Sequence, residues 1–283
     1  MMTVPSLDET LRNSCSWVSF QPEVAGALNQ AIRELTDAER ADLVRMQAQW
    51  TDDFQPVAEP GRPPLFYALF YLSLVPHVRE KLRPRHIPED VIRETVRDLE
   101  VWMADYRQRF GFWGLDNILW PRMTFAGRLF ALGRLQFEPT TLPATCLLPE
   151  GLGADSPILN IHIPATGPLD DVACGESLRR ALAFFPEHFP EFHPVAFYCE
   201  SWIMDRQFST LLPDSNIAKF QNRFQSLERK TSCDRQMWER VFGGRMDPAD
   251  APRDTALQRI VLDHIASGGR WSLGAGYLPL ASA

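Results

Sequence analysis

A histidine, a cysteine and a glutamate lie in two apolar runs that predict β-strands, and all three can perform acid–base or nucleophilic chemistry. His162 lies in ILNIHIP, and Cys199 and Glu200 lie in VAFYCESW. Side chains alternate along a strand, so Asn160 and His162 share a face, as do Tyr198 and Glu200. Imidazole accepts protons near pH 7, and thiolates attack carbonyl carbons. The alternative is that the histidine and the cysteine are packing residues, which is the commoner role of each in a strand.

A loop and a helix follow the histidine-bearing strand. Pro164, Gly167 and Pro168 end the strand, and GES at 175–177 leads into a helix that we predict over 177–185. The first N–H groups of a helix lack intrahelical partners and can bind anionic oxygens such as those of a pyrophosphate. The loop is therefore a candidate anion site.

Charged residues around this loop act on a bound anion in opposite directions. Asp170, Asp171 and Glu176 would repel phosphate, whereas Arg179 or Arg180 would supply the positive charge that phosphate binding requires. The sequence alone leaves the balance between these charges open.

Further polar or aromatic residues are candidates for substrate contact or for purely structural roles. Asp116, within FWGLDNILW, either orients an amine or caps the following helix. Asn216 follows Ser215 at the start of a predicted helix, where capping competes with substrate contact. Trp202 follows the second strand and is a candidate substrate contact. Glu138 either ends a strand in solvent or takes part in function.

The periodicity of the chain predicts helices over the first ~120 residues and an α/β pattern after about residue 123. Thr36 and Glu39 predict a capping box, Pro88 a helix start and Gly111 a helix end. Runs of β-forming residues predict strands at 128–138, 143–148, 158–163, 195–201 and 271–278. Helical periodicity predicts later helices at 177–185, 215–225, 234–242 and 254–267.

Composition excludes several classes of function. The 283 residues carry a net charge of −7, and the only uncompensated basic run is KLRPRH at 81–86, so we expect no nucleic-acid partner. The longest apolar run, at 65–75, is about half the ~20 residues of a membrane span. The N-terminus does not resemble a signal peptide, and the five cysteines are scattered, so we expect a cytoplasmic protein with reduced thiols.

Several ordered segments together resemble a family of bacterial acyltransferases to which the glycopeptide-antibiotic N-acyltransferases belong. These segments are LGRLQFE at 132–138, NIHIPATGPL at 160–169, GESLRRALAFF at 175–185, CESWIMD at 199–205 and LLPDSNIAKFQNRF at 211–224. The resemblance implies an α+β chain, with a helical N-terminal acyltransferase domain at 1–122. A GNAT-like acyl-CoA-binding domain, a mixed sheet flanked by helices, would follow at 123–283.

The resemblance also implies where coenzyme A binds. In a GNAT-like fold the pantetheine arm runs between two parallel strands that splay apart, here 158–163 and 195–201, and the pyrophosphate lies on the turn at 165–177. The usual phosphate-loop pattern, Q/R-x-x-G-x-G/A, is absent. The implied cofactor contacts are Ile163, Thr166, Gly167, Gly175, Glu176, Ser177, Arg179 and Arg180.

The chemistry that the resemblance implies is transfer of an acyl group from acyl-CoA to an amine, without a metal. His162 would be the general base, with Glu200 and Cys199 as further catalytic candidates, and with Asp116, Trp202 and Asn216 as substrate contacts. We expect a monomer or a homodimer whose partners are small molecules. Two alternatives stay open: a non-catalytic acyl-CoA-binding protein, and a transferase or hydrolase that uses Cys199 as its nucleophile.

Overall fold

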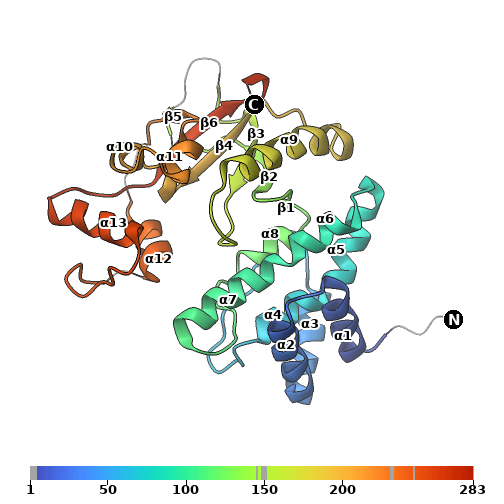
Figure 1. Cartoon of the computed structure of the whole chain (residues 1–283). Helices are drawn as coiled ribbons and strands as arrows, with labels where there is room; N and C mark the ends of the chain where they lie inside the picture. Colours follow the sequence, from blue (N-terminus) through green and yellow to red (C-terminus); the bar gives the residue numbers. More distant parts are fainter. Residues whose placement is uncertain (1–4, 145, 148–151, 230–232, 245, 283) are drawn as a thin grey trace. The chain divides into compact units, whose positions relative to one another are not determined.

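The computed structural model describes the chain except for residues 1–4, 145, 148–151, 230–232, 245 and 283 (Figure 1). It forms two compact units. The first comprises Met1–Leu132 and Pro164–Thr166, and the second comprises Gly133–Ile163 and Gly167–Ala283. The predicted α+β class is confirmed, because helices form the first unit and a mixed sheet with flanking helices forms the second.

The first unit is built from helices that bury apolar side chains against one another. Every residue of α4 is buried. The elements are α1 (Leu7–Val18), α2 (Pro22–Glu34), α3 (Asp37–Ala48), α4 (Phe66–Ser73), α5 (Val75–Leu82), η1 (Arg83–Arg85), α6 (Glu89–Val96), α7 (Asp98–Phe110), α8 (Pro121–Phe125) and the short strand β1 (Phe130–Ala131).

Local signals in the sequence set several helix ends of this unit. The Thr36 Oγ1 atom accepts a hydrogen bond from Glu39 N at 3.2 Å, and Glu39 Oε2 accepts one from Thr36 N at 2.8 Å. This reciprocal pair is the predicted capping box, and it starts α3. Pro88 precedes α6, and Gly111 ends α7 with a φ of 82°, a left-handed conformation that favours glycine.

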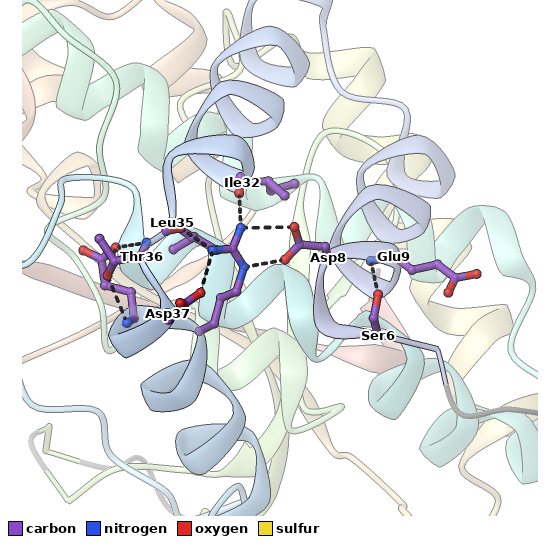
Figure 2. A network of polar contacts seen from close by, with 9 residues as sticks. Ser6, Asp8, Glu9, Ile32, Leu35, Thr36 and Asp37 are labelled. Atoms are coloured by element: carbon purple, nitrogen blue, oxygen red, sulfur yellow. Dashed lines mark hydrogen bonds and ion pairs between the residues drawn. The ribbon is translucent and has the colours of Figure 1, made fainter.

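Arg40 joins three helices of the first unit through hydrogen bonds to Asp8, Ile32 and Leu35, the residues that Figure 2 labels around this contact. Its guanidinium donates from Nε to Asp8 Oδ1 at 2.9 Å and from Nη2 to Asp8 Oδ2 at 3.2 Å, which links α3 to α1. It also donates to the main-chain oxygens of Ile32, at 3.2 Å, and Leu35, at the C-terminal end of α2. These carbonyls have no intrahelical donor, so Arg40 satisfies groups that the end of α2 leaves open.

In the second unit the described residues form strands in the order β2-β3-β4-β6-β5. Strand β3 pairs parallel with β4, and the other neighbouring strands pair antiparallel. Its elements are β2 (Gln136–Thr141), β3 (Pro157–His162), α9 (Asp171–His188), β4 (Ala196–Ser201), η2 (Trp202–Met204), α10 (Gln207–Leu211), α11 (Asn216–Gln221), β5 (Gln225–Leu227), α12 (Arg235–Phe242), α13 (Ala256–Ala266), β6 (Gly274–Pro279) and η3 (Leu280–Ser282).

The two faces of this sheet differ in character. On one face Phe137, Leu159 and Phe197 are almost completely buried, and α9, which connects β3 to β4, lies along the sheet (Figure 1). The opposite face carries the polar residues of β2 and β3 at one end and an apolar cluster, with Ile158 and Tyr198, at the other. Alternation along the strands therefore separates core residues from a partly polar face.

The predicted strands at 158–163, 195–201 and 271–278 correspond to β3, β4 and β6. The prediction of one strand at 128–138 was wrong, because the chain divides there into β1 and β2 around Gly133, whose φ is 96°. Residues 143–148 form no strand where they are described, only an isolated bridge between Cys146 and Arg229; residues 145 and 148 lie outside the described residues. The short strand β5 was not predicted, because QSL shows neither a run of β-branched residues nor a turn signal. Helix α9 begins at Asp171 rather than at 177, because the Asp170 side chain caps it by accepting from Ala173 N at 2.9 Å.

None of the helices in the described part of the chain has the length and apolar character to cross a bilayer. The apolar run at 65–75 instead supplies α4 and the start of α5 in the core of the first unit.

Replacing Asp8 by asparagine tests the contribution of the Arg40 contact. The hydrogen bond from Arg40 lowers the pKa of Asp8 in the folded protein. The pair therefore stabilises the fold above the ordinary carboxyl pKa of about 4, and this contribution is lost as the pH falls through the lowered value. We expect Asp8→Asn to lower the melting temperature at pH 7, with a difference that disappears in strong acid. Thermal melts from pH 7 to pH 2 measure this, and Asp53→Asn, at an exposed position, is the control. A pH-independent difference would contradict the interpretation.

Candidate functional site

The parallel strands β3 and β4 separate at their C-terminal ends. Their pairing comprises three positions and ends at Asn160 and Tyr198. Beyond that point β3 stays paired with β2 as far as His162, and β4 stays paired with β6 as far as Ser201. The sheet thus opens between its two central strands, as the sequence resemblance implied.

The His162 side chain lies beside the opening and contacts two polar neighbours. Its Nε2 atom is 3.1 Å from Glu138 Oε2 and 3.2 Å from Asn160 Nδ2, and Asn160 Nδ2 donates to the same Glu138 oxygen at 3.4 Å. The exposed fractions of the side chains are 19% for His162 and 11% for Glu138. The predicted histidine is thus a partly accessible member of a hydrogen-bonded acid–imidazole pair, and not an apolar packing residue.

Glu200, on the other side of the opening, is held by two neighbours. Its Oε1 atom is 2.5 Å from Arg229 Nη1, and its Oε2 atom accepts from the Tyr198 hydroxyl at 2.8 Å. Burial and the nearby Glu200 and Cys146 groups raise the pKa of Tyr198, so the phenol stays protonated at neutral pH. Both carboxylate oxygens of Glu200 are thus engaged by neighbouring side chains, which favours an electrostatic or structural role for this residue.

Cys199 lies on the opposite face of β4 from Glu200 and has no exposed surface. Burial raises the pKa of its thiol to about 12, and the charge of Glu200 acts in the same direction. At neutral pH the group is an uncharged thiol inside the core. Its position and protonation state both oppose the predicted role as a nucleophile.

The loop between β3 and α9 is held by an arginine that the sequence did not single out. Arg134 donates from Nε to Pro168 O at 2.8 Å and from Nη2 to Gly167 O at 2.9 Å. These carbonyl oxygens carry no formal charge, so they orient the guanidinium without neutralising it. Burial lowers the pKa of Arg134, although the side chain remains cationic at neutral pH.

The two aspartates of the loop are engaged in local contacts. Asp170 caps α9, and Asp171 Oδ1 is 2.6 Å from Arg223 Nη2, which also donates to Asp171 O at 2.9 Å. The expected repulsion of phosphate is thus reduced, because Arg223 offsets one charge and the capping N–H stabilises the other.

Several predicted coenzyme contacts lie within α9 rather than in the loop. The Ser177 side chain is buried, accepts from Leu135 N at 3.3 Å and donates to Ala173 O at 3.0 Å. Glu176 pairs with Arg179 on an exposed face. Because the helix starts earlier than predicted, Ser177 is one of its interior residues, and its hydroxyl forms hydrogen bonds with main-chain atoms of the fold.

The remaining predicted contacts lie in the loop after β3 and in α9. Thr166 is exposed, Ile163 is partly buried directly after β3, and Gly167 has a left-handed φ of 128°. Gly175 lies in α9, where an added Cβ would be 3.4 Å from an Arg223 nitrogen. Arg180 is an exposed residue of α9.

The three predicted substrate contacts have structural partners. Asp116 accepts from Arg109 Nη1 and Nη2 at 2.7 and 2.8 Å, and these hydrogen bonds lower its pKa. The Trp202 ring packs against Phe208, with their centroids 5.6 Å apart, within an apolar cluster. Asn216 is the first residue of α11, which Ser215 caps by accepting from Ala218 N at 3.1 Å. Asp116 lies in the first unit, whereas Trp202 and Asn216 lie in the second unit with His162.

Sequence reasoning left the role of Glu138 open, between the end of a strand and a function, and assigned no site role to Arg134 or Arg223. Glu138 had a readable signal, since Gln136 and Glu138 alternate with apolar residues on a strand that precedes the histidine strand. The two arginines had none, because their roles depend on main-chain oxygens and an aspartate that only the fold brings near them. Among the described residues no cluster of three or more potential metal ligands occurs.

Comparisons with known proteins agree with this architecture. Residues 9–127 match the family described as N-acyltransferase N-terminal domain, and residues 129–278 match the GNAT-like C-terminal domain. Among curated proteins no sequence matches the chain.

Solved structures of an acyltransferase resemble the chain over nearly its whole length. One, in complex with decanoyl-CoA and teicoplanin, has a TM-score of 0.79 and 26% identity, covering 98% of this chain and 90% of that one. Another, in complex with CoA and 10C-teicoplanin, has a TM-score of 0.77 and 25% identity, with the same coverage. Since the two domain families together span most of the sequence, the chain belongs to the N-acyltransferases that join a helical N-terminal domain to a GNAT-like C-terminal domain.

Proposed function

We propose that the protein transfers an acyl group from acyl-CoA to an amine by direct attack, with His162 as the general base. The observation that carries the proposal is the position of His162, two residues beyond the last β3–β4 pair and partly accessible. The similar acyltransferases bind decanoyl-CoA or CoA together with a glycopeptide. An amine on a glycopeptide scaffold is accordingly the acceptor class that we propose.

The chemistry requires one proton to leave the attacking amine. The amine nitrogen forms a bond to the thioester carbon while the imidazole of His162 takes the N–H proton, which avoids a cationic tetrahedral intermediate. The carbon–sulfur bond then breaks, and coenzyme A leaves as a thiolate. The thiolate takes up one proton, and the imidazolium of His162 releases the proton that it took from the amine, so the base is regenerated. The products are an amide and free CoA, with no covalent enzyme intermediate.

The oxyanion of the tetrahedral intermediate needs hydrogen-bond donors already in place. Past Tyr198 the ladder between β3 and β4 has ended, so main-chain N–H groups on the β3-facing edge of β4 are not used by that ladder. We propose that one of them binds the thioester oxygen.

The pyrophosphate of CoA is proposed to bind at the loop that precedes α9. The N-terminus of this 18-residue helix and the guanidinium of Arg134 together supply positive potential there. Arg134, rather than Arg179 or Arg180, is then the residue that supplies the positive charge for the pyrophosphate.

A variant that lacks the imidazole tests the proposed base. We expect His162→Ala to lower kcat for CoA release from decanoyl-CoA, in the presence of an amine-bearing glycopeptide of the teicoplanin type, by about 10²- to 10⁴-fold. The Kd for decanoyl-CoA should stay within about twofold, since general-base catalysis acts in the transition state. His193→Ala, at an exposed histidine, is the matched control. Unchanged kcat, with CoA still raising the melting temperature, would favour a non-catalytic acyl-CoA-binding protein.

Replacing Cys199 by serine tests the acyl-enzyme alternative. Because the thiol is buried with a pKa near 12, we expect kcat per folded molecule to stay within about threefold. Intact-mass spectrometry of the wild type after incubation with decanoyl-CoA should show no acyl adduct. Iodoacetamide at pH 8 should label the exposed Cys233 and leave Cys199 unmodified. A stable adduct that disappears in Cys199→Ser would overturn direct transfer.

Removing the loop arginine tests the proposed pyrophosphate site. We expect Arg134→Ala to raise KM for decanoyl-CoA by about tenfold, with a smaller change in kcat. A tenfold change is the loss of affinity expected when one charge-assisted hydrogen bond is removed. The effect should diminish as the salt concentration rises. Arg235→Ala, on α12 with a side chain 80% exposed, should leave KM unchanged. Equal KM values for Arg134→Ala and the wild type would place the phosphates elsewhere.

A further inference from the structure

A cavity of about 250 Å³ lies at the C-terminal end of β4, where η2, β5 and the start of β6 meet. Its lining includes the charged residues Asp205, Arg206 and Arg229 and the apolar residues Leu227 and Ala275. All of its lining residues belong to the second unit. The proposed base and the loop before α9 do not contribute to it, so the cavity is separate from the parts of the site described above.

The strand register places the cavity on the face of the sheet that carries His162. Glu200 of β4 is opposite Ala275 of β6, and Ala275 is opposite Leu227 of β5, so the three form one row across the sheet. Ala275 and Leu227 also belong to the apolar cluster that contains Ile158. Ile158 precedes His162 by four residues on β3, and both therefore point to the same face. The proposed base and the cavity are thus on one face, with β4 between them.

Asp205 and Arg229 are engaged by neighbouring groups. The buried Asp205 carboxylate accepts hydrogen bonds at both oxygens, from Gln207 N to Oδ1 at 3.1 Å and from Ser272 N to Oδ2 at 2.8 Å. The Arg229 Nη1 atom is 2.5 Å from Glu200 Oε1, which offsets the charge of the guanidinium. Both charged groups thus have partners within the protein and do not require a ligand.

Arg206 differs from them, because no residue that the structure describes forms a hydrogen bond or an ion pair with its guanidinium. The side chain is exposed at the cavity. A guanidinium offers donors in a planar fork that matches the two oxygens of a carboxylate. The nearby Asp205 charge and the offset charge of Arg229 leave little further positive potential. A single carboxylate therefore fits the cavity better than the phosphates of CoA, which require a concentrated basic site.

The geometry of the sheet sets the distance between the cavity and the base. Neighbouring strands are about 4.8 Å apart, and β4 separates β3 from β6, so His162 and Ala275 lie on strands about 10 Å apart. A ligand that occupies both positions must carry its carboxylate at least about that far from its amine. An α-amino acid is too short, because its two groups share one carbon. A peptide-sized acceptor is long enough.

We propose that the cavity binds a carboxylate of the acceptor through Arg206, and that it selects acceptors whose amine and carboxylate are about 10 Å or more apart. This inference rests on the proposed amine acylation at His162, and it adds a group that the protein recognises away from the reacting atoms. Arg206 does not touch those atoms. Its loss should therefore weaken binding of the acceptor and leave binding of acyl-CoA unchanged.

Two acceptors that differ only in the carboxylate test the proposal. The first is an amine-bearing glycopeptide of the teicoplanin type with a free peptide carboxylate, and the second is its methyl amide. With decanoyl-CoA as the donor, we expect the KM of the wild type for the acid to be about tenfold lower than that for the methyl amide, the difference that one charged hydrogen-bonded pair typically makes. The KM for decanoyl-CoA should be the same with both acceptors.

Replacing Arg206 should remove this preference. We expect Arg206→Ala to raise the KM for the acid about tenfold, to the value for the methyl amide, while kcat and the KM for decanoyl-CoA change by less than about twofold. Arg206→Lys keeps the charge without the planar fork and should recover part of the preference. Arg235→Ala, on α12 with a side chain 80% exposed, is the matched control and should keep the wild-type preference.

The same KM for both acceptors in the wild type would overturn the proposal. An Arg206→Ala variant that raises both values by one common factor, or that keeps the preference for the acid, would do so too. If Arg206→Ala instead raises the KM for decanoyl-CoA alone, the guanidinium serves the phosphates of CoA and the proposal is wrong.

Calorimetry without acyl-CoA separates the cavity from the proposed reaction. If neither acceptor is acylated, the proposed function is wrong. A lower Kd for the acid than for the methyl amide, lost in Arg206→Ala, would still support the cavity as a carboxylate site. Equal Kd values, or no binding of either compound, would contradict it.

Discussion

The site depends on the early end of one hydrogen-bonded ladder, the one between β3 and β4. Parallel strands at the centre of a sheet normally continue their pairing, which uses their backbone groups and leaves no space between them. Here each strand keeps an outer partner, β2 or β6, while the inner pairing ends at Asn160 and Tyr198. The outer ladders stabilise the strands enough for the inner one to open. His162 and Glu200 therefore lie on the two strands beyond the point where their pairing ends.

The sequence predicted much of this arrangement, because its strongest signals are local. Alternation in ILNIHIP placed His162 on the more polar face of its strand, and the capping residues located the start of α3 and the end of α7. What was not predicted depends on partners distant in the chain. The contact of Glu138 with His162 requires the register of β2 against β3, which strand composition alone does not define.

The start of α9 shows how a local signal can still be misread. The apolar residues that begin at Leu178 suggested a helix from about 177, but a helix can extend beyond its apolar stripe when a cap is available. Asp170 provides that cap, and Arg223 holds Asp171 in the first turn. The acidic residues that seemed to weaken an anion site therefore help to build the helix end at which we propose that the pyrophosphate binds. The sequence left the charge balance open because it could not show that Arg134 and Arg223 lie beside this loop.

The pairing of β4 with β6 has a consequence for the order of folding. Ser201 of β4 pairs with Gly274 of β6, and the whole segment from η2 to α13 separates the two. Such non-local pairing is slow, because a long loop must close before any of its contacts form. Until β6 arrives, β4 has only its three-residue pairing with β3 and exposes an edge. A nascent or partly unfolded chain thus exposes an apolar strand that can pair with another molecule. Aggregation should therefore compete with correct refolding most strongly before the β4–β6 ladder forms.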